Sequence, residues 1–339
     1  MRTYALLAST AFVALTTAGA SGTWGKAPRL PTPRSAHAVV VAAGAIHVLG
    51  GPGGDRVDRF DGHTWSLETH LPGGIVNAPV AVALGTKLYA IGGFLGATNL
   101  PTADVWVFDL SARTWSAGPP LPAPVGGAAA VVLGGRIHVL GGGNNVSTVA
   151  THYVLDPATG LWTTAAALPR AEGSPAAVVR SGKIYAIGGR SGSSDYGNTF
   201  VYDPSADTWA RGPSIPPRGT AGAAVWRGSI YLFGGESQSA GSVLGGVFRL
   251  APGARAWRGP AGSPRRATTP APSSSGVAST SSEGASPRAT RTRRAVAGSS
   301  SGSRRGEATR ASCSVRRQTT PTGRLELPTP SLRVMCSTS

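Results

Sequence analysis

Arginine, glutamate, histidine and asparagine side chains recur at two fixed positions of a repeated sequence pattern. One position follows a Leu-Pro or Ile-Pro pair, and the other follows a Gly-Gly pair that ends an apolar run. Arginine can donate two parallel hydrogen bonds to a carboxylate, and glutamate or histidine can exchange protons with a substrate. The residues at the first position are Arg34, Ser35, His37, Asn77, Glu172 and Arg218, and those at the second are Phe94, Asn144, Asn145, Arg190 and Glu236.

The pattern that carries these residues occurs five times. Each copy has a Val-rich run, a second apolar run that ends in Gly-Gly, a variable loop, an aromatic-rich run and a run with a Trp. Successive Trp residues are 50, 47, 47 and 48 positions apart, and a fixed period of this length indicates a repeat architecture. We predict that all five are buried: Trp65, Trp115, Trp162, Trp209 and Trp257.

The short runs predict strands. They are rich in Val, Ile and aromatic residues and are bounded by Gly, Pro, Asp and Ser, with no helical apolar period after the first 20 residues. A four-stranded sheet cannot bury both faces alone, whereas sheets packed radially around an axis can, as in a β-propeller. The pattern resembles the kelch repeat over residues 24–257. The resemblance implies an all-β fold, a kelch-type β-propeller with five complete four-stranded blades.

A sixth, split blade is also expected. Trp24 lies before Leu30-Pro31 in the same way as the other periodic Trp residues lie before their Leu-Pro or Ile-Pro pairs. The segment around Trp24 is therefore expected to be the last strand of a blade whose other strands follow residue 257. That C-terminal part appears lost, because residues 262–339 contain no aromatic residue and hold 13 of the 32 Lys and Arg. Back-translated and read in another frame, residues 264–284 can encode PTPRHDTGAVVLGGRIYVLGG, the start of a kelch unit. We interpret residues 262–339 as a disordered basic tail produced by a frameshift.

The remaining composition sets the expected localisation and excludes some partners. Residues 1–20 read as a signal peptide with a small-x-small cleavage site, which predicts a secreted or periplasmic protein, and residues 21–261 form the propeller. No later run is apolar enough to cross a membrane. Residues 1–261 have a net charge of +7 and no basic stripe, which disfavours nucleic acid. Both cysteines, Cys313 and Cys336, lie in the tail, and we expect no metal or other cofactor.

Two histidines are interpreted as packing residues. His47 and His138 occupy the second-run position that is Tyr in the other copies, and a position that accepts either ring indicates packing. The Tyr residues at that position are Tyr89, Tyr185 and Tyr231.

The kelch resemblance implies where a site would lie. Propeller loops converge at the axis, so the two recurring positions are expected around one mouth. Ligand-binding candidates there are Arg34, Ser35, Asn77, Asn144, Arg190 and Arg218, and catalytic candidates are Glu172, Glu236 and His37.

Two functions are compatible with such a mouth. The first is a secreted, monomeric module that binds a protein or a glycan. The second is a carbohydrate-active enzyme similar to the periplasmic sialic acid epimerases of the kelch type. In that enzyme an arginine would hold the substrate carboxylate while a glutamate or histidine moves protons for ring opening.

Overall fold

The computed structural model describes residues 3–6, 12–16, 23–52 and 54–259, with side chains from Ala27 onward. All regular elements in these ranges are β-strands, so none is a helix of the length and apolarity that a membrane span requires. The predicted frameshift tail, residues 262–339, lies outside the described residues.

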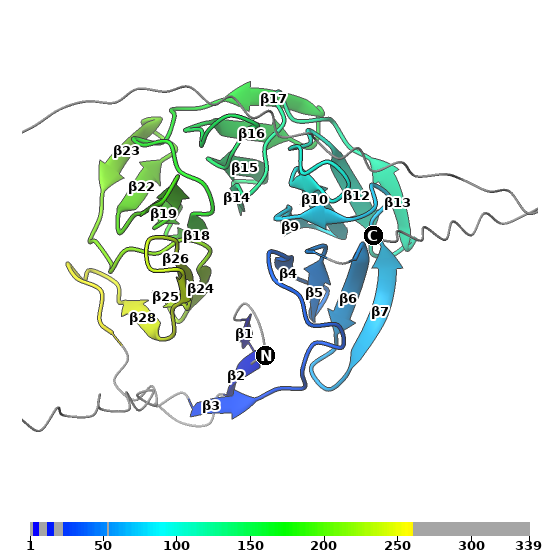
Figure 1. The fold of residues 1–339 in the computed structure, drawn as a ribbon, viewed down its shortest axis with the longest axis horizontal. Helices are drawn as coiled ribbons and strands as arrows, with labels where there is room; N and C mark the ends of the chain where they lie inside the picture. Colours follow the sequence, from blue (N-terminus) through cyan, green and yellow to red (C-terminus); the bar gives the residue numbers. More distant parts are fainter. Residues whose placement is uncertain (1–2, 7–11, 17–22, 53, 260–339) are drawn as a thin grey trace, which may run out of the picture. The chain divides into compact units, whose positions relative to one another are not determined.

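Four antiparallel four-stranded sheets form blades 1 to 4 (Figure 1). Each sheet begins with a Val- or Ala-rich strand at the centre of the ring and ends with the Trp-bearing strand at the periphery. The strands are β4 (Ala38–Ala42), β5 (Ala45–Leu49), β6 (Arg56–Phe60) and β7 (Trp65–His70) in blade 1; β9 (Val80–Leu84), β10 (Lys87–Ile91), β12 (Val105–Asp109) and β13 (Thr114–Ala117) in blade 2; β14 (Ala129–Leu133), β15 (Arg136–Leu140), β16 (His152–Asp156) and β17 (Leu161–Thr164) in blade 3; and β18 (Ala176–Arg180), β19 (Lys183–Ile187), β22 (Thr199–Asp203) and β23 (Thr208–Arg211) in blade 4.

Blade 5 has three strands: β24 (Gly222–Trp226), β25 (Ser229–Phe233) and β28 (Val247–Leu250). Its fourth position holds a single bridge between Arg249 and Arg258 instead of a strand. The turn at Pro252 and Gly253 brings Trp257 back to the blade, but only two described residues follow that Trp. The predicted five-bladed arrangement is confirmed, and the expected fourth strand of blade 5 is reduced to this bridge.

The core lies between successive blades. The inner strands β4, β9, β14, β18 and β24 are neighbours in that order (Figure 1). Ile137 and Val139 of blade 3, for example, are at most 1% exposed and pack against Tyr89 and Ile91 of blade 2. Burying one such aliphatic side chain contributes about 1.5–3 kcal/mol. These shared cores fix each blade against its neighbour and so position the loops at the ends of the ring.

A further sheet contains β1 (Thr3–Leu6), β2 (Phe12–Thr16) and β3 (Thr23–Lys26), in that order. Trp24 lies on the edge strand β3, as expected for the last strand of a blade, but β3 pairs with β2 and not with C-terminal strands. β1 lies beside β24 of blade 5. Residues 1–20, which the sequence predicts as a signal peptide, include two strands of this sheet, and the signal peptide stays a prediction from the sequence.

The five periodic Trp residues are half-buried, so the prediction that they are buried was wrong. Four of them lie on the peripheral strands β7, β13, β17 and β23, and Trp257 lies next to the Arg249–Arg258 bridge of blade 5. Each indole N–H donates to the residue two positions before a Leu-Pro or Ile-Pro pair, because an indole N–H that leaves water needs an acceptor. The acceptors are the Pro28 carbonyl at 3.1 Å, the Thr69 hydroxyl at 3.2 Å, and the carbonyls of Pro119 at 3.0 Å, Ala166 at 2.8 Å and Pro213 at 3.0 Å.

Candidate functional site

The two recurring positions of the sequence lie at the same end of the blades. The segment before each inner strand, which we call the entry segment, pairs with the segment after the Gly pair, which we call the exit segment. In blades 2 to 5 the paired residues are Asn77 with Phe94, Gly126 with Gly143, Gly173 with Arg190, and Gly219 with Glu236. This end of the ring is the mouth.

The Gly pair brings each exit segment against the next blade. Gly92 has φ +57°, and a Cβ there would collide with the carbonyl oxygen of Val125 in blade 3. The N–H of Gly93 donates to that same oxygen at 2.9 Å. Only glycine permits this approach at this backbone conformation, so the Gly-Gly signature encodes the joint between blades.

A belt of four backbone hydrogen bonds links the entry segments of blades 1 to 5. One entry-segment residue of each blade has a positive φ. In blades 2 to 5 this residue donates its N–H to the carbonyl of the equivalent residue in the preceding blade. The four bonds run from Ala78 to Ala36 (2.8 Å), Gly127 to Ala78 (3.0 Å), Ser174 to Gly127 (2.6 Å) and Thr220 to Ser174 (3.0 Å). The belt fixes the spacing of the five entry segments, so the mouth is a preorganised surface.

Three predicted site residues are buried two positions before the belt residue of their blade. They occupy the same position of the entry segment, which we call the slot. In blades 2 to 5 the backbone carbonyl of the slot residue accepts the N–H of the second glycine of the Gly pair in the preceding blade. The slot is at most 7% exposed in every blade, and two blades fill it with valine. Its occupants are Arg34, Val76, Val125, Glu172 and Arg218.

Arg34 is part of a buried charge cluster. Its Nη2 lies 2.7 Å from Asp58 Oδ2 and donates to the Val48 carbonyl at 3.1 Å, and both charged side chains are at most 1% exposed. Arg56 donates to the other Asp58 oxygen at 2.7 Å. Burial lowers the pKa of Arg34, and Asp58 partly opposes that shift. The charge of Arg34 is therefore balanced within blade 1.

Arg218 is satisfied by backbone and an aromatic ring. Its Nη1 donates to the Gly234 carbonyl at 2.8 Å and its Nε to the Pro216 carbonyl at 3.1 Å. The guanidinium carbon lies 4.4 Å from the centroid of the Phe248 ring, within the range of a cation–π contact. Burial lowers the pKa of Arg218, and its contacts hold blade 5 together.

Glu172 is fully buried and hydrogen-bonded to one side chain. Asn198 Nδ2 donates to its two carboxylate oxygens at 3.1 and 3.4 Å. Burial raises the pKa of Glu172 to about 7, while the Asn198 hydrogen bond and the charge of Arg170 act in the opposite direction. A carboxyl with this pKa could exchange protons near neutrality, but a ligand at the mouth would not touch it in this conformation.

Two part-exposed charges at the mouth form an ion pair. Arg190 Nη1 lies 2.6 Å from Glu236 Oε1, with the two side chains 29% and 38% exposed. The Thr220 hydroxyl donates to the same oxygen at 2.6 Å, and Arg190 also donates to Gln238 at 3.0 Å. The structure brings these two predicted residues together from neighbouring blades.

The other candidates have separate surroundings. Asn144 caps its own loop, because its Oδ1 accepts the N–H groups of Val146 and Ser147 at 2.8 Å. His37 packs on Gly51, and burial followed by the nearby charge of Arg34 lowers its pKa. Ser35 is exposed, and Asn77 is half-buried in β8 (Val76–Asn77).

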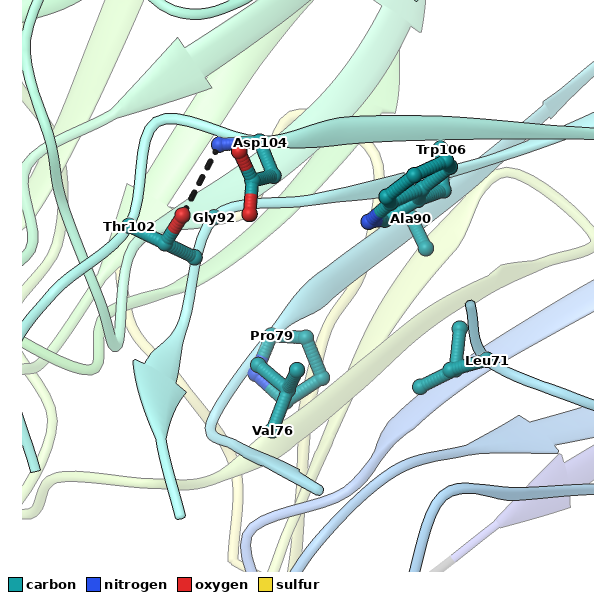
Figure 2. Close-up of a pocket in the computed structure, with 8 residues that line it drawn as sticks. All are labelled: Leu71, Val76, Pro79, Ala90, Gly92, Thr102, Asp104 and Trp106. Atoms are coloured by element: carbon teal, nitrogen blue, oxygen red, sulfur yellow. Dashed lines mark hydrogen bonds between the residues drawn. The ribbon is translucent and has the colours of Figure 1, made fainter. Parts of the chain in front are cut away.

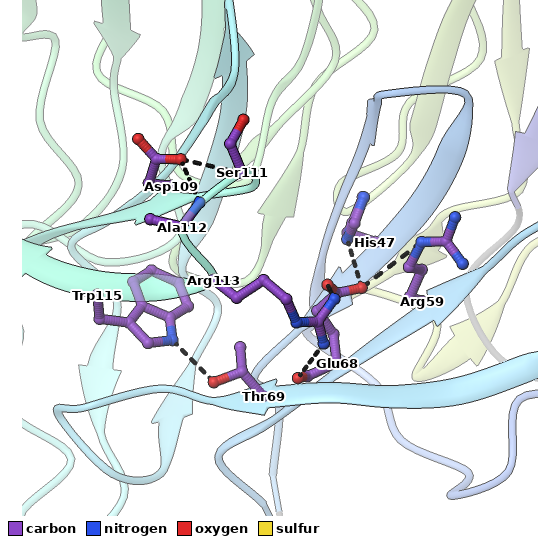
Figure 3. A network of polar contacts seen from close by, with 9 residues as sticks. All are labelled: His47, Arg59, Glu68, Thr69, Asp109, Ser111, Ala112, Arg113 and Trp115. Atoms are coloured by element: carbon purple, nitrogen blue, oxygen red, sulfur yellow. Dashed lines mark hydrogen bonds and ion pairs between the residues drawn. The ribbon is translucent and has the colours of Figure 1, made fainter.

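Sequence reasoning missed a charge network between blades 1 and 2 (Figure 3). Glu68 is 3% exposed and lies 2.7 Å from Arg113, 3.6 Å from Arg59 and 3.9 Å from His47. Burial lowers the pKa of His47. No spacing in the repeat marked Glu68, because the peripheral strand that carries it varies between copies.

A small pocket lies near the joint of blades 1 and 2 (Figure 2). Its polar side chains are Thr102 and Asp104, and the Thr102 hydroxyl accepts the Asp104 N–H at 3.1 Å. Among the described residues, no three His, Cys, Asp or Glu side chains are grouped so that they could hold a metal ion. The remaining lining residues are Leu71, Val76, Pro79, Ala90, Gly92 and Trp106.

The repeats and the blade topology define a kelch-repeat β-propeller, and comparison with known proteins agrees. Residues 63–217 match the family model described as the KLHDC2/KLHL20/DRC7 Kelch-repeats domain. The solved structure of YjhT superposes with a TM-score of 0.64 over 74% of this chain and 91% of that one, at 16% identity, a likeness of fold alone.

Two curated relatives share part of the sequence. Kelch-like protein 35 of Mus musculus is 31% identical over 142 residues, which is 39% of this chain and 23% of that protein. N-acetylneuraminate epimerase of Pasteurella multocida (strain Pm70) is 32% identical over 152 residues, which is 42% of this chain and 38% of that protein. The match thus spans less than half of each relative.

Proposed function

We propose that this chain is a binding module that holds a protein or a glycan at the mouth of its propeller. The hydrogen-bonded belt supports this, because it presents variable loops on a backbone that does not have to be ordered when a ligand binds. The observation that carries the proposal is the internal pairing of the mouth's charges. Glu172 is buried against Asn198, and Glu236 is held by Arg190 and Thr220, so neither acid is presented free to a substrate.

The alternative is a sugar epimerase or mutarotase. The similarity to N-acetylneuraminate epimerase favours it, as does the pKa of about 7 at Glu172, since an acid–base catalyst works best near the ambient pH. Arg218 or Arg34 would then hold a carboxylate, and Glu172, Glu236 or His37 would move protons. That role requires opening of the entry segments, because Arg34, Arg218 and Glu172 are buried.

A glycan array combined with proton NMR of sialic acid anomers separates the two functions. Retention of a glycan or protein without faster anomer exchange supports the binding module. Accelerated exchange that is lost in Glu172→Gln or Glu236→Gln overturns the binding module in favour of the enzyme. A wild-type chain that neither binds nor converts any probe removes both.

Export and a monomeric state are parts of this proposal that rest on the sequence. Residues 1–20 favour export, and N-terminal mass measurement of the protein recovered outside the cell tests it. Sedimentation of the purified chain tests the monomeric state.

A further inference from the structure

The mouth divides into a charged half and an uncharged half. The entry and exit segments of blades 2 and 3, residues 73–79, 92–103, 124–128 and 141–151, contain no Asp, Glu, Lys or Arg. The corresponding segments of blades 4 and 5 carry Arg170, Glu172, Arg190, Asp195, Arg218 and Glu236, and those of blade 1 carry Arg34 and Asp55.

The uncharged half exposes aliphatic side chains. Ile75 and Leu100 are each 44% exposed in blade 2, and Val146 is 92% exposed in blade 3. Phe94 and Leu95 are half-buried between them. We call these five residues the apolar patch. Single exposed aliphatic residues are common, but neighbouring ones on one face mark interaction sites.

Backbone contacts join the segments that carry the blade 2 residues of the patch. In blade 2, β8 pairs with β11 (Phe94–Leu95), and Leu95 N–H donates to the Leu100 carbonyl at 2.9 Å. Gly96 N–H donates to the Ile75 carbonyl at 2.8 Å. These bonds place Ile75, Leu95 and Leu100 on one short hairpin.

The Phe94 ring connects this hairpin to blade 3. It lies so close to Gly126 that a Cβ there would collide with the ring, and it also lies near Gly143. Gly143 pairs with Thr148 across the loop that carries Val146, and Asn144 caps that loop. The patch is therefore preorganised, so little conformational entropy would be lost on binding.

The charged half is already bonded to itself. Besides the Arg190–Glu236 pair, Asp195 on β21 (Ser194–Asp195) accepts the Ser237 hydroxyl at 2.9 Å and the N–H groups of Gln238 at 3.0 Å and Ser239 at 3.2 Å. A ligand that used these groups would have to replace bonds that exist. The apolar patch has exposed area and no such competition.

We propose that the apolar patch is the contact surface for an uncharged, apolar segment of a partner protein. This rests on the proposed binding function and narrows its ligand to protein. Charge complementarity argues for that occupant, because a charged segment would find no counter-ion on the entry and exit segments of blades 2 and 3. The five side chains of the patch carry no hydrogen-bonding group, which suits an apolar peptide better than a hydroxyl-rich sugar.

The probe is a library of short random peptides displayed on phage and selected on the immobilised full chain. Selected peptides are then measured by fluorescence anisotropy against the wild type, Ile75→Asp, Leu100→Asp and Val146→Asp. Leu161→Asp is the matched control, because Leu161 is 65% exposed on the peripheral strand β17. Circular dichroism checks folding, and the 92% exposure of Val146 makes that variant safe if another fails to fold.

The proposal predicts that uncharged apolar peptides are enriched. Their Kd should rise about tenfold or more in Val146→Asp and in the folded blade 2 variants, but not in Leu161→Asp. Absence of enrichment, or equal binding to all variants, overturns it. Acidic or basic peptides lost only in Arg190→Ala would overturn it while leaving the mouth as the binding site. Concentration-dependent dimerisation abolished by Val146→Asp would show that the occupant is a second copy, which also overturns it.

Discussion

Glu172→Gln should change how the stability of the propeller depends on pH. The carboxyl is fully buried in a slot that is valine in two other blades, and burial raises its pKa from 4.5 to about 7. The folded state holds the proton of Glu172 more tightly than the unfolded state does. The stabilisation of the folded state by this protonated carboxyl is therefore complete below pH 4.5. It is lost progressively as the pH rises towards about 7.

The size of the effect follows from the shift. One pKa unit corresponds to about 1.4 kcal/mol, so the ionised carboxyl costs the folded state about 3 kcal/mol above neutrality. Glutamine keeps the shape and the contact with Asn198 but does not ionise. The stability of Glu172→Gln relative to the wild type should therefore rise by about 3 kcal/mol between pH 4.5 and 7.5, or on the order of 10 °C in melting temperature.

Urea unfolding followed by circular dichroism at a series of pH values measures this difference. Asp109→Asn is a suitable control, because the N–H groups of Ala112 and Ser111 lower the pKa of Asp109 from 3.8. Its carboxyl is therefore ionised in both the folded and the unfolded state between pH 4.5 and 7.5, and this substitution should give a stability difference that does not vary with pH over that range. A difference between Glu172→Gln and the wild type that does not vary with pH, or that falls as the pH rises, would refute the assignment of Glu172 as a buried acid.

Three further outcomes are expected. Asp58→Ala should destabilise the chain by about 3 kcal/mol in urea unfolding, because Arg34 then keeps a buried, unpaired charge. The double variant Arg34→Leu, Asp58→Phe should recover most of that loss, and additive losses in it would contradict this reasoning. Burial lowers the pKa of His138 from 6.5 to about 4, so the free energy of unfolding should fall as the pH drops from 6.5 to about 4. His138→Tyr should reduce this loss of stability, and an unchanged acid unfolding profile would argue against it. Sequencing of the gene should reveal a kelch-coding frame across codons 258–290, and a chain in the corrected frame should melt at a higher temperature; a gene without that frame disproves the frameshift.

Much of the fold could be predicted because its signals are local and repeated. The Gly pair marks a joint that only glycine permits, as Gly92 against Val125 shows, and it recurs with the Trp period. The interpretation of His47 and His138 as packing residues was correct, since they are 1% and 5% exposed. The half-buried Trp residues were not predicted, because spacing locates a strand but does not say how much solvent reaches the edge of a ring on it.

For the site, the sequence by itself determined that the candidate residues of all blades lie at one end, because the repeat fixes the positions of the entry and exit segments. Only the tertiary structure decided which of those side chains face outward. Arg34, Glu172 and Arg218 share a slot that is at most 7% exposed. Asp58 pairs with Arg34, burial raises the pKa of Glu172, and two backbone carbonyls accept hydrogen bonds from Arg218. Burial and pairing depend on residues from other blades, as between Arg190 and Glu236, and contacts at that sequence distance leave no local pattern.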